Sequence, residues 1–343
     1  MLEYLVYRHT YNENIYHIQT AEKNGNRGLF VRERLGLHML TNEISIGLYR
    51  NMIDPVLISK THSVSGKLSI AAELECYNTI GKDCVAVCVN DLVASGAKPL
   101  FFYDTISCAR PKKDPVEDME KGATEACEEI GIAYAGSEIM ELPDIFHYDQ
   151  YDMVGFAVGI FDRGVSQGKR PVKQSDVIMG IASDGLHNNG YVTVKKKLFL
   201  TKTSMEAYYE NLHGTLGELL IQPTRCYQRV LEAVYQEGIP IDRCTQVTHG
   251  GLDAALRRLL PENCGAVIKQ PIQNIPPLYL MLHQDGNIPL EQLRMICNMG
   301  VGMLFIVPEE DVEHTIDIID ESGERPVPLG LVEMRSKEIR YIQ

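Results

Sequence analysis

Three features are missing or scarce in this 343-residue sequence. It has no run of about 20 apolar residues, the length that a membrane-spanning helix needs, so we expect no such helix. Its N-terminus has no basic region followed by an apolar stretch, so we expect no signal peptide. Lys and Arg number 33 against 46 Asp and Glu, for a formal net charge of −13. This excess of acid argues against a surface that binds nucleic acid.

Paired cysteine motifs are also missing. The nine cysteines are scattered, no two form a Cys-x-x-Cys pair, and several lie in apolar runs. This pattern argues against a zinc site or a disulfide framework. It favours reduced, buried thiols in a cytoplasmic protein.

The composition otherwise predicts an ordinary globular protein. Hydrophobic residues make up 45% and charged residues 23% of the chain, which is enough apolar material for a core. The length allows two domains, and predicted strands and helices alternate in both halves, so we expect a mixed α/β fold. A polar, turn-rich segment at 164–174 predicts the boundary. The predicted parts are a leader at 1–50 with no assigned fold, a first domain at 51–165 and a second at 170–343.

Apolar patterning and turn signals place the individual elements. The predicted strands are 56–59, 100–107, 132–135, 151–162, 176–182, 304–307 and 328–332, the last being the final core strand. The predicted helices are 66–77, 114–130, one from 191, 223–234, 252–260, 290–297 and 312–322. Periodicity does not decide between helix and strand for 83–89.

The stretch 87–104 contains two apolar runs, each of which ends near an acidic residue, Asp91 and Asp104. We interpret it as a buried framework that presents carboxylates at its edge. Carboxylates in that setting suit a hard cation and the phosphates that it carries. An aspartate that caps a helix is an equally good interpretation of either residue alone.

Three junctions in the second half combine Gly with Ser, Thr or Asn, at 183–190, 248–251 and 298–302. Glycine lets backbone N–H groups approach an anion, and a following helix N-terminus adds favourable partial charge. The three loops together predict a phosphate-containing ligand. None of them is a Walker A loop or a G-x-G-x-x-G fingerprint, so the ordinary nucleotide-binding folds are not indicated.

Three side chains could carry chemistry. His187 lies in a polar Gly/Asn loop, which favours proton transfer or phosphate contact over a plain turn histidine. Glu138 and Glu141 lie three apart, just past the strand predicted at 132–135, so they could face one site as metal ligand and general base. Two solvated carboxylates are the alternative interpretation.

Together these stretches resemble the aminoimidazole ribonucleotide synthetase family, also called phosphoribosylformylglycinamidine cyclo-ligase, of purine biosynthesis. The resemblance runs in order from about residue 54 to the C-terminus. It is carried by residues 79–83, 89–92, 96–102, 151–152, 155–159, 183, 185–187, 189–191, 223–225, 250–252, 298 and 300–303.

The resemblance implies an N-terminal domain that pairs with its twin into a dimeric β-barrel, and a C-terminal α/β domain. It implies small-molecule nucleotide substrates, with ATP and Mg²⁺ used to activate a formyl amide oxygen as a phosphate, which an internal nitrogen displaces as the imidazole ring closes. The implied catalytic residues are Glu138, Glu141 and His187, and the implied metal ligands are Asp91 and Glu141. The implied ATP- and phosphate-binding residues are Lys67, Asn90, Asp91, Asp104, Gly136, Ser183, Gly185, Asn189, Gly190, Thr248, Gly250 and Gly251.

The phosphate-handling stretches depart from the family pattern. Where the family reads Ser-Gly-Thr-Asp-Gly-Val-Gly-Thr-Lys, residues 59–67 read Ser-Lys-Thr-His-Ser-Val-Ser-Gly-Lys. His62 therefore replaces an acidic residue expected to help hold Mg²⁺, Ser63 and Ser65 replace glycines, and His249 replaces another. Two alternatives to cyclo-ligase activity follow: a non-catalytic or regulatory homologue that keeps the dimer, and a related kinase or synthetase with a different acceptor.

Overall fold

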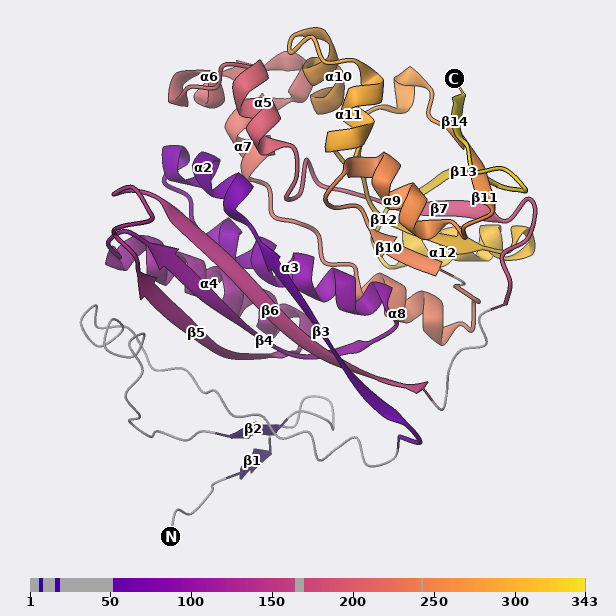
Figure 1. Ribbon diagram of the computed structural model, residues 1–343, viewed down its shortest axis with the longest axis horizontal. Helices are drawn as coiled ribbons and strands as arrows, with labels where there is room; N and C mark the ends of the chain where they lie inside the picture. The colour runs from indigo at the N-terminus through magenta and orange to yellow at the C-terminus, as the bar shows by residue number, and fades with distance from the viewer. Residues whose placement is uncertain (1–5, 9–15, 19–51, 164–169, 242, 343) are drawn as a thin grey trace. The chain divides into compact units, whose positions relative to one another are not determined.

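The computed structural model describes residues 6–8, 16–18, 52–163, 170–241 and 243–342. It divides into two compact units between residues 166 and 167, and each unit combines helices with a sheet (Figure 1), which confirms the mixed α/β class. Most of the predicted leader lies outside the described residues. Within it, β1 (Val6–Arg8) and β2 (Tyr16–Ile18) form an antiparallel pair.

Unit 1 is a four-stranded sheet with helices packed on one face (Figure 1). The strand order is β3-β6-β4-β5; β6 is antiparallel to both of its neighbours, and β4 is parallel to β5. The elements are β3 (Pro55–Ser63), α2 (Ser65–Leu74), α3 (Asn78–Ala94), β4 (Lys98–Cys108), α4 (Lys113–Ile130), β5 (Ala133–Glu141) and β6 (Tyr151–Asp162).

Helix α4 follows directly from its sequence. Val116, Met119, Ala123 and Cys127 recur at helical spacing and are buried, so they form one apolar stripe toward the core. Gly131 ends the helix in the left-handed conformation, with φ 72°, which glycine adopts without steric cost. The helix predicted at 114–130 is confirmed.

Helix α3 settles the segment 83–89, which is helical. It is apolar on most sides because it packs against both the sheet and α4. A Cβ on Gly81 would lie 2.0 Å from the Met119 carbonyl oxygen, and one on Gly122 would lie 1.9 Å from that of Asn78. The two glycines therefore allow the backbones of α3 and α4 to touch.

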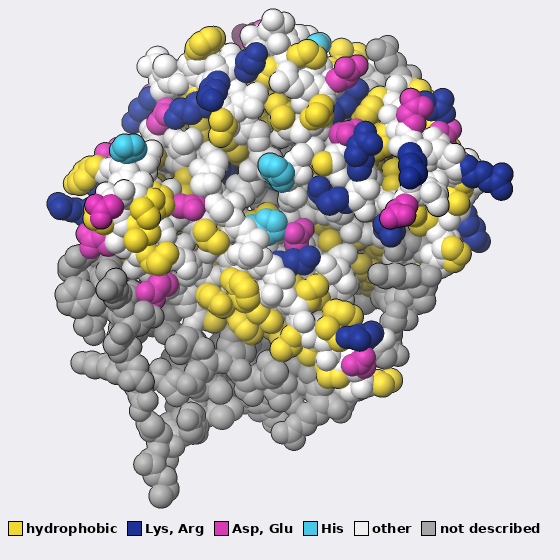
Figure 2. All heavy atoms as spheres, in the orientation of Figure 1, with side chains coloured by type: hydrophobic (Ala, Val, Ile, Leu, Met, Phe, Trp, Pro, Cys, Tyr) yellow, Lys and Arg dark blue, Asp and Glu magenta, His cyan; other side chains and the backbone are white. Residues whose placement is uncertain are grey.

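The other face of the sheet carries an exposed apolar surface. Strand side chains alternate between faces, so Phe102 and Ile106 are buried on the helix side while Tyr103, between them, is 41% exposed. The Tyr103 and Phe156 rings lie 5.0 Å apart, and Leu57 is 55% exposed. Figure 2 shows hydrophobic side chains gathered where β3 and β6 face the viewer.

Unit 2 is built on a six-stranded sheet of order β10-β12-β7-β13-β11-β14. Its strands are β7 (Val177–Ala182), β10 (Arg243–Gln246), β11 (Cys264–Lys269), β12 (Val301–Val307), β13 (Pro326–Met334) and β14 (Ile339–Ile342). Its helices are α5 (Tyr191–Lys197), α6 (Lys202–Glu206), α7 (Leu216–Ile221), α8 (Gln228–Gln236), α9 (Gly251–Leu259), α10 (Pro277–Gln284), α11 (Leu290–Ile296) and α12 (Val312–Glu321).

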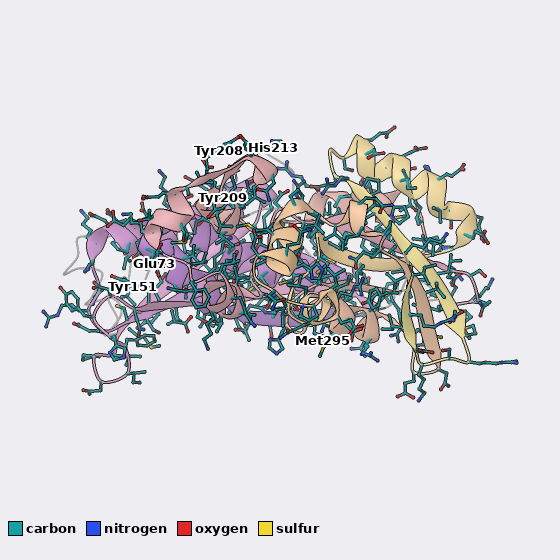
Figure 3. The ribbon with its side chains drawn as sticks, turned by 90° about the horizontal axis from the view of Figure 1, so that it is seen from above. Glu73, Tyr151, Tyr208, Tyr209, His213 and Met295 are labelled. Carbon is teal, nitrogen blue, oxygen red and sulfur yellow. The ribbon has the colours of Figure 1, made fainter. Side chains whose placement is uncertain are left out.

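Short elements complete unit 2. Strands β8 (Tyr208–Tyr209) and β9 (Gly214–Thr215) form a small hairpin around a 3-10 turn, and Figure 3 shows its residues Tyr208, Tyr209 and His213 close together. Two further 3-10 turns span Ile272–Asn274 and Glu309–Asp311. No helix in the described part of the chain is long and apolar enough to cross a membrane.

The strand predicted at 328–332 lies within β13, which is the last strand with buried side chains in the described part of the chain, although it is not the last strand of the sheet. Strand β14 follows it and pairs in parallel with β11 at the sheet edge. Half-buried residues, Ile339 and Tyr341, alternate along it with the exposed Arg340 and Ile342. Such a pattern suits an edge strand with one face toward the core.

Candidate functional site

The three glycine-containing loops of unit 2 meet at one edge of its sheet. Strand β12 is antiparallel to both β7 and β10, so the ends of β7 and β10 lie beside the start of β12. The loops after β7 and β10 and before β12 therefore emerge together. The Ser183 N–H donates to the Gly300 carbonyl at 3.0 Å, and the Val247 N–H donates to that of Gly302 at 2.9 Å.

Asn298 links two of these loops. Its Nδ2 donates to the Gly185 carbonyl at 3.1 Å, and its Oδ1 accepts from the Gly300 N–H at 3.1 Å. The Tyr279 hydroxyl contacts Asn298 Oδ1 and donates to the Gly185 carbonyl at 2.9 Å. Burial raises the pKa of Tyr279, so its hydroxyl keeps the proton that it donates. Sequence reasoning missed Tyr279, which lies on α10 away from any polar motif.

His187 lies inside this assembly. Its side chain is buried, its φ is +55°, and its ring centroid is 6.1 Å from that of Tyr227. A Cβ on Gly302 would lie 1.9 Å from the Tyr227 hydroxyl and 2.5 Å from His187 Cε1. Gly302 thus gives both rings the room that they occupy. The role of His187 in proton transfer or phosphate contact stays a prediction.

The remaining predicted residues of unit 2 lie in the same loops. Gly190 and Gly250 precede α5 and α9 with φ of +90° and +83°, and Gly251 has φ +64°. A Cβ on Gly251 would lie 2.4 Å from the Arg294 carbonyl oxygen, so this loop also packs against α11. Ser183 is buried, and its Oγ donates to the Gly185 carbonyl, while Asn189 and Thr248 are half-buried.

An ion-pair network missed by sequence reasoning braces the first loop. Arg225 donates through Nε and Nη2 to Asp184 Oδ2, at 2.8 and 2.6 Å, and through Nη1 to Glu324 Oε2 at 2.5 Å. Arg225 belongs to the Pro-Thr-Arg motif at 223–225, and the family resemblance of this motif was the only feature of the sequence that pointed to Arg225. The network fixes Asp184 next to Ser183, at the start of the loop.

In unit 1 the framework at 87–104 differs from its prediction. Asp104 lies in the middle of β4 and is 1% exposed, so it is not at an edge. Its carboxylate accepts from the Tyr134 hydroxyl at 2.7 Å and from Ser137 Oγ at 2.8 Å. Asp91 lies in the last turn of α3. The sequence left the apolar run before it open between helix and strand, because a buried strand and a buried helix look alike over a few residues.

Two further predicted phosphate-binding residues are enclosed. Lys67 Nζ lies 2.8 Å from Asp83 Oδ2, and both side chains are 0% exposed. Asn90 is also fully buried, in α3. Neither side chain is at the surface, so contact with a nucleotide would require it to move, and their predicted role is untested.

The two glutamates do not share a face. Strand β5 continues through Glu141 instead of ending at residue 135, and residues three apart in a strand point to opposite sides. Ser137 reaches Asp104 on the helix side, which places Glu138 on the open face and Glu141 on the helix side. Gly136 is half-buried within the strand. The interpretation of Glu138 and Glu141 as a pair facing one site is wrong.

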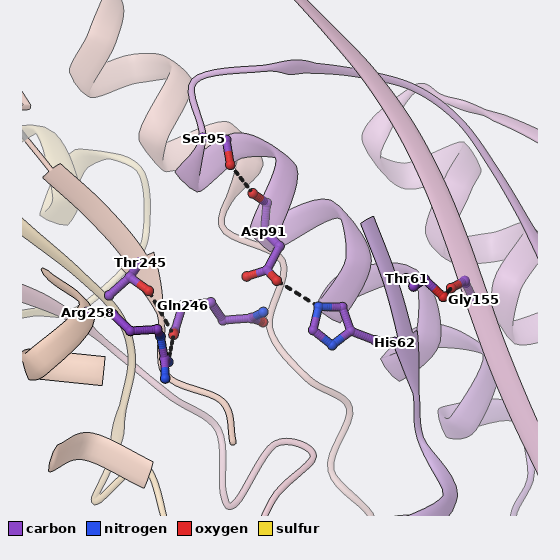
Figure 4. A network of polar contacts seen from close by, with 8 residues as sticks. All are labelled: Thr61, His62, Asp91, Ser95, Gly155, Thr245, Gln246 and Arg258. Atoms are coloured by element: carbon purple, nitrogen blue, oxygen red, sulfur yellow. Dashed lines mark hydrogen bonds and ion pairs between the residues drawn. The ribbon is translucent and has the colours of Figure 1, made fainter. Parts of the chain in front are cut away.

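The resemblance implied that Asp91 and the residue at position 62 belong to one metal site, and the structure brings the Asp91 and His62 side chains into contact. His62 Nε2 lies 2.7 Å from Asp91 Oδ2 (Figure 4). The two side chains are 26% and 25% exposed, so the pair reaches the surface. Ser95 Oγ donates to the Asp91 carbonyl at 2.8 Å.

The Mg²⁺ implied by the resemblance does not fit Asp91 in this arrangement. Mg²⁺ takes oxygen ligands in near-octahedral geometry, whereas Asp91 Oδ2 contacts an imidazole nitrogen. Burial raises the pKa of nearby Cys88, so that residue supplies no thiolate. Across the described residues, no three or more His, Cys, Asp or Glu side chains form a group that could hold a metal ion.

Comparison with known families decides the classification. The model of the AIR synthase related protein N-terminal domain matches residues 52–161, and that of the C-terminal domain matches residues 173–342. The chain belongs to the AIR synthase related protein family. The three glycine-containing loops of unit 2 and the His62–Asp91 pair of unit 1 are therefore features of a two-domain member of this family.

Curated relatives are similar in sequence to this chain over most of their length. The phosphoribosylformylglycinamidine cyclo-ligase of Lachnoclostridium phytofermentans is 35% identical over 304 residues, which are 89% of this chain and 89% of that protein. The protein of the same name from Geobacillus sp. is 38% identical over 280 residues, 81% of each chain.

Solved structures share the fold at low identity. The Escherichia coli hydrogenase maturation protein HypE matches with a TM-score of 0.63 and 13% identity, over 88% of this chain and 86% of its own. Thiamine-monophosphate kinase from Stenotrophomonas maltophilia matches with a TM-score of 0.62 and 15% identity, over 87% and 90%. These likenesses support the two-domain fold alone.

Proposed function

We propose that this protein is a phosphoribosylformylglycinamidine cyclo-ligase, which closes the imidazole ring of aminoimidazole ribonucleotide from formylglycinamidine ribonucleotide at the expense of ATP. The observation that carries the proposal is the 35% identity to a cyclo-ligase over 89% of both chains. Coverage of that extent includes both domains. The proposal includes a cytoplasmic location.

The loops of unit 2 support a phosphate-bearing substrate. Three glycine-containing turns emerge at one sheet edge, and nine-residue helix α9 begins directly behind one of them. Backbone N–H groups and a helix N-terminus favour bound anions. We propose that His187 and Asn189 contact the substrate there, while Ser183, Gly185 and Gly190 shape the loop.

A direct assay tests the function. The purified protein is given ATP, Mg²⁺ and formylglycinamidine ribonucleotide, and both phosphate release and aminoimidazole ribonucleotide are measured, with a curated relative as the positive control. Stoichiometric formation of both products is expected. Absence of turnover while the relative is active would contradict the proposal.

The His62–Asp91 contact favours a second candidate, a non-catalytic homologue that keeps the scaffold. It engages a carboxylate expected to bind metal. Calorimetric titration with ATP in the presence of Mg²⁺ separates the candidates. Tight ATP binding without turnover of any formylglycinamidine substrate would point to a changed acceptor, and absence of binding would favour the non-catalytic candidate.

We also propose that two copies pair through the open sheet face of unit 1. Leu57 and Tyr103 are exposed there, and Val154 and Val158 lie on the same face because they pair with Thr105 and Phe101. An apolar face of this kind on a sheet is typical of an interaction surface. A second copy presents the same face, which suits a symmetric pair.

A further inference from the structure

Two elements hold His62 against Asp91. His62 lies opposite Gly155 in the β3–β6 register, and Asp91 lies in the last turn of α3. A Cβ on Gly155 would lie 2.5 Å from the Phe102 ring and 2.7 Å from Cys84 Sγ of α3. The missing side chain of Gly155 therefore lets α3 pack closely on the sheet at this level.

The direction of the hydrogen bond follows from the groups involved. An ionised carboxylate only accepts hydrogen bonds, so Nε2 of His62 carries the hydrogen and donates it to Asp91 Oδ2 across 2.7 Å. That hydrogen bond occupies acceptor capacity of Oδ2 that a cation bound to this oxygen would otherwise use. An imidazole and a divalent cation therefore compete for the same oxygen.

We propose that the His62 imidazole takes the place of a divalent cation at Asp91, so that Asp91 positions His62 and is not a metal ligand. A phosphate-bearing ligand at this position would meet an oriented imidazole instead of a metal ion. That last consequence rests on the proposed function, whereas the exclusion of metal from Asp91 is a property of the protein alone.

Mn²⁺ is the probe, because it takes oxygen ligands as Mg²⁺ does and its free concentration can be followed by electron paramagnetic resonance. Four full-length proteins are titrated without nucleotide: wild type, Asp91→Asn, His62→Asp and the double variant. Ser69→Asp adds the same carboxylate at an exposed position of α2 and is the matched control. Circular dichroism melting verifies that each variant is folded.

The expected result is that wild type, Asp91→Asn and Ser69→Asp bind Mn²⁺ alike. His62→Asp should gain one site at least about tenfold tighter than the background, within the range by which a ligand's surroundings change metal affinity, and the double variant should lose it. Tighter binding by wild type than by Asp91→Asn would overturn the proposal. So would a folded His62→Asp that gains no site.

Cyclo-ligase activity is not used in this experiment. An inactive wild type would contradict the proposed function and leave the Mn²⁺ result standing. Conversely, an active enzyme whose Asp91 already binds Mn²⁺ would overturn only the inference about His62.

Discussion

Lys67 Nζ lies 2.8 Å from Asp83 Oδ2 with neither side chain exposed, so α2 and α3 are joined by a completely buried ion pair. Burial lowers the pKa of Lys67, although the charge and hydrogen bond of Asp83 raise it. Loss of hydration therefore opposes the attraction between the two groups. Replacing one partner of such a pair leaves the other as an uncompensated buried charge. Replacing both partners by apolar residues leaves no buried charge.

We therefore expect Lys67→Met to lower the free energy of unfolding by about 3–5 kcal/mol. The double variant Lys67→Met/Asp83→Leu should lose clearly less than Lys67→Met alone. Urea denaturation of the wild type, Lys67→Met, Asp83→Leu and the double variant measures the difference. A double variant that loses the sum of the two single effects would show that the residues do not act as a pair.

The second prediction concerns Asp104. Tyr134→Phe removes the hydroxyl that donates to this buried carboxylate at 2.7 Å and retains a ring at 6.1 Å from that of Phe102. Hydrogen bonds to charged groups contribute about 1.5–3 kcal/mol, so unfolding free energy should fall by that amount. Tyr148→Phe, at an exposed tyrosine, is the control. Equal effects of the two substitutions would contradict the structural role of Asp104.

Gly302 tests the packing around His187. Gly302→Ala would place a methyl group against the Tyr227 hydroxyl and His187 Cε1, and overpacking of this kind typically costs about 1–3 kcal/mol. We expect kcat/KM to fall at least about tenfold if His187 moves, since 1.4 kcal/mol corresponds to that factor.

Two further variants make the Gly302 experiment specific. Gly214→Ala adds the same methyl group where only the flexible Glu218 carboxylate lies near, at 3.3 Å, and should keep full activity. Tyr227→Phe removes the atom nearest to the new methyl group, so it should partly restore Gly302→Ala. No restoration, or an equal loss in Gly214→Ala, would count against the packing explanation.

The fourth prediction concerns pairing of two copies. Tyr103→Lys places a charge in the centre of the open sheet face, beside Phe156, and should convert a dimer into a monomer in sedimentation velocity. Ile145→Lys adds the same charge at an exposed loop residue and should leave the mass unchanged. A wild-type protein that sediments as a monomer, or a dimer in Tyr103→Lys, would refute this interface.

Local signals predicted much of the fold. The strand at 151–162 and the helix at 114–130 were correct because each combines a clear apolar pattern with turn residues at its ends. The helix predicted from residue 223 begins only at Gln228, because residues 223–226 form the loop that carries Arg225. Strand β11, between β13 and β14, was missed because its six residues lack a distinctive pattern.

The site was harder to predict because its contacts join residues far apart in the sequence. Sequence placed the three loops of unit 2 on strand ends, but their meeting depends on the order β10-β12-β7. The His62–Asp91 contact depends on the way α3 packs against β3. Glu138 and Glu141 were paired wrongly because the strand extends six residues farther than its apolar start indicates.

The pairing of β3 with β6 also limits how early the sheet of unit 1 can form during synthesis. Strand β3 ends at Ser63, and its partner β6 begins only at Tyr151. On the ribosome, β3 must therefore wait until the chain through Asp162 has emerged before its hydrogen-bonding edge is covered. Such long-range pairing slows folding. The sheet that carries His62 therefore stays incomplete until β6 has emerged, and unpaired strand edges of this kind favour aggregation during synthesis.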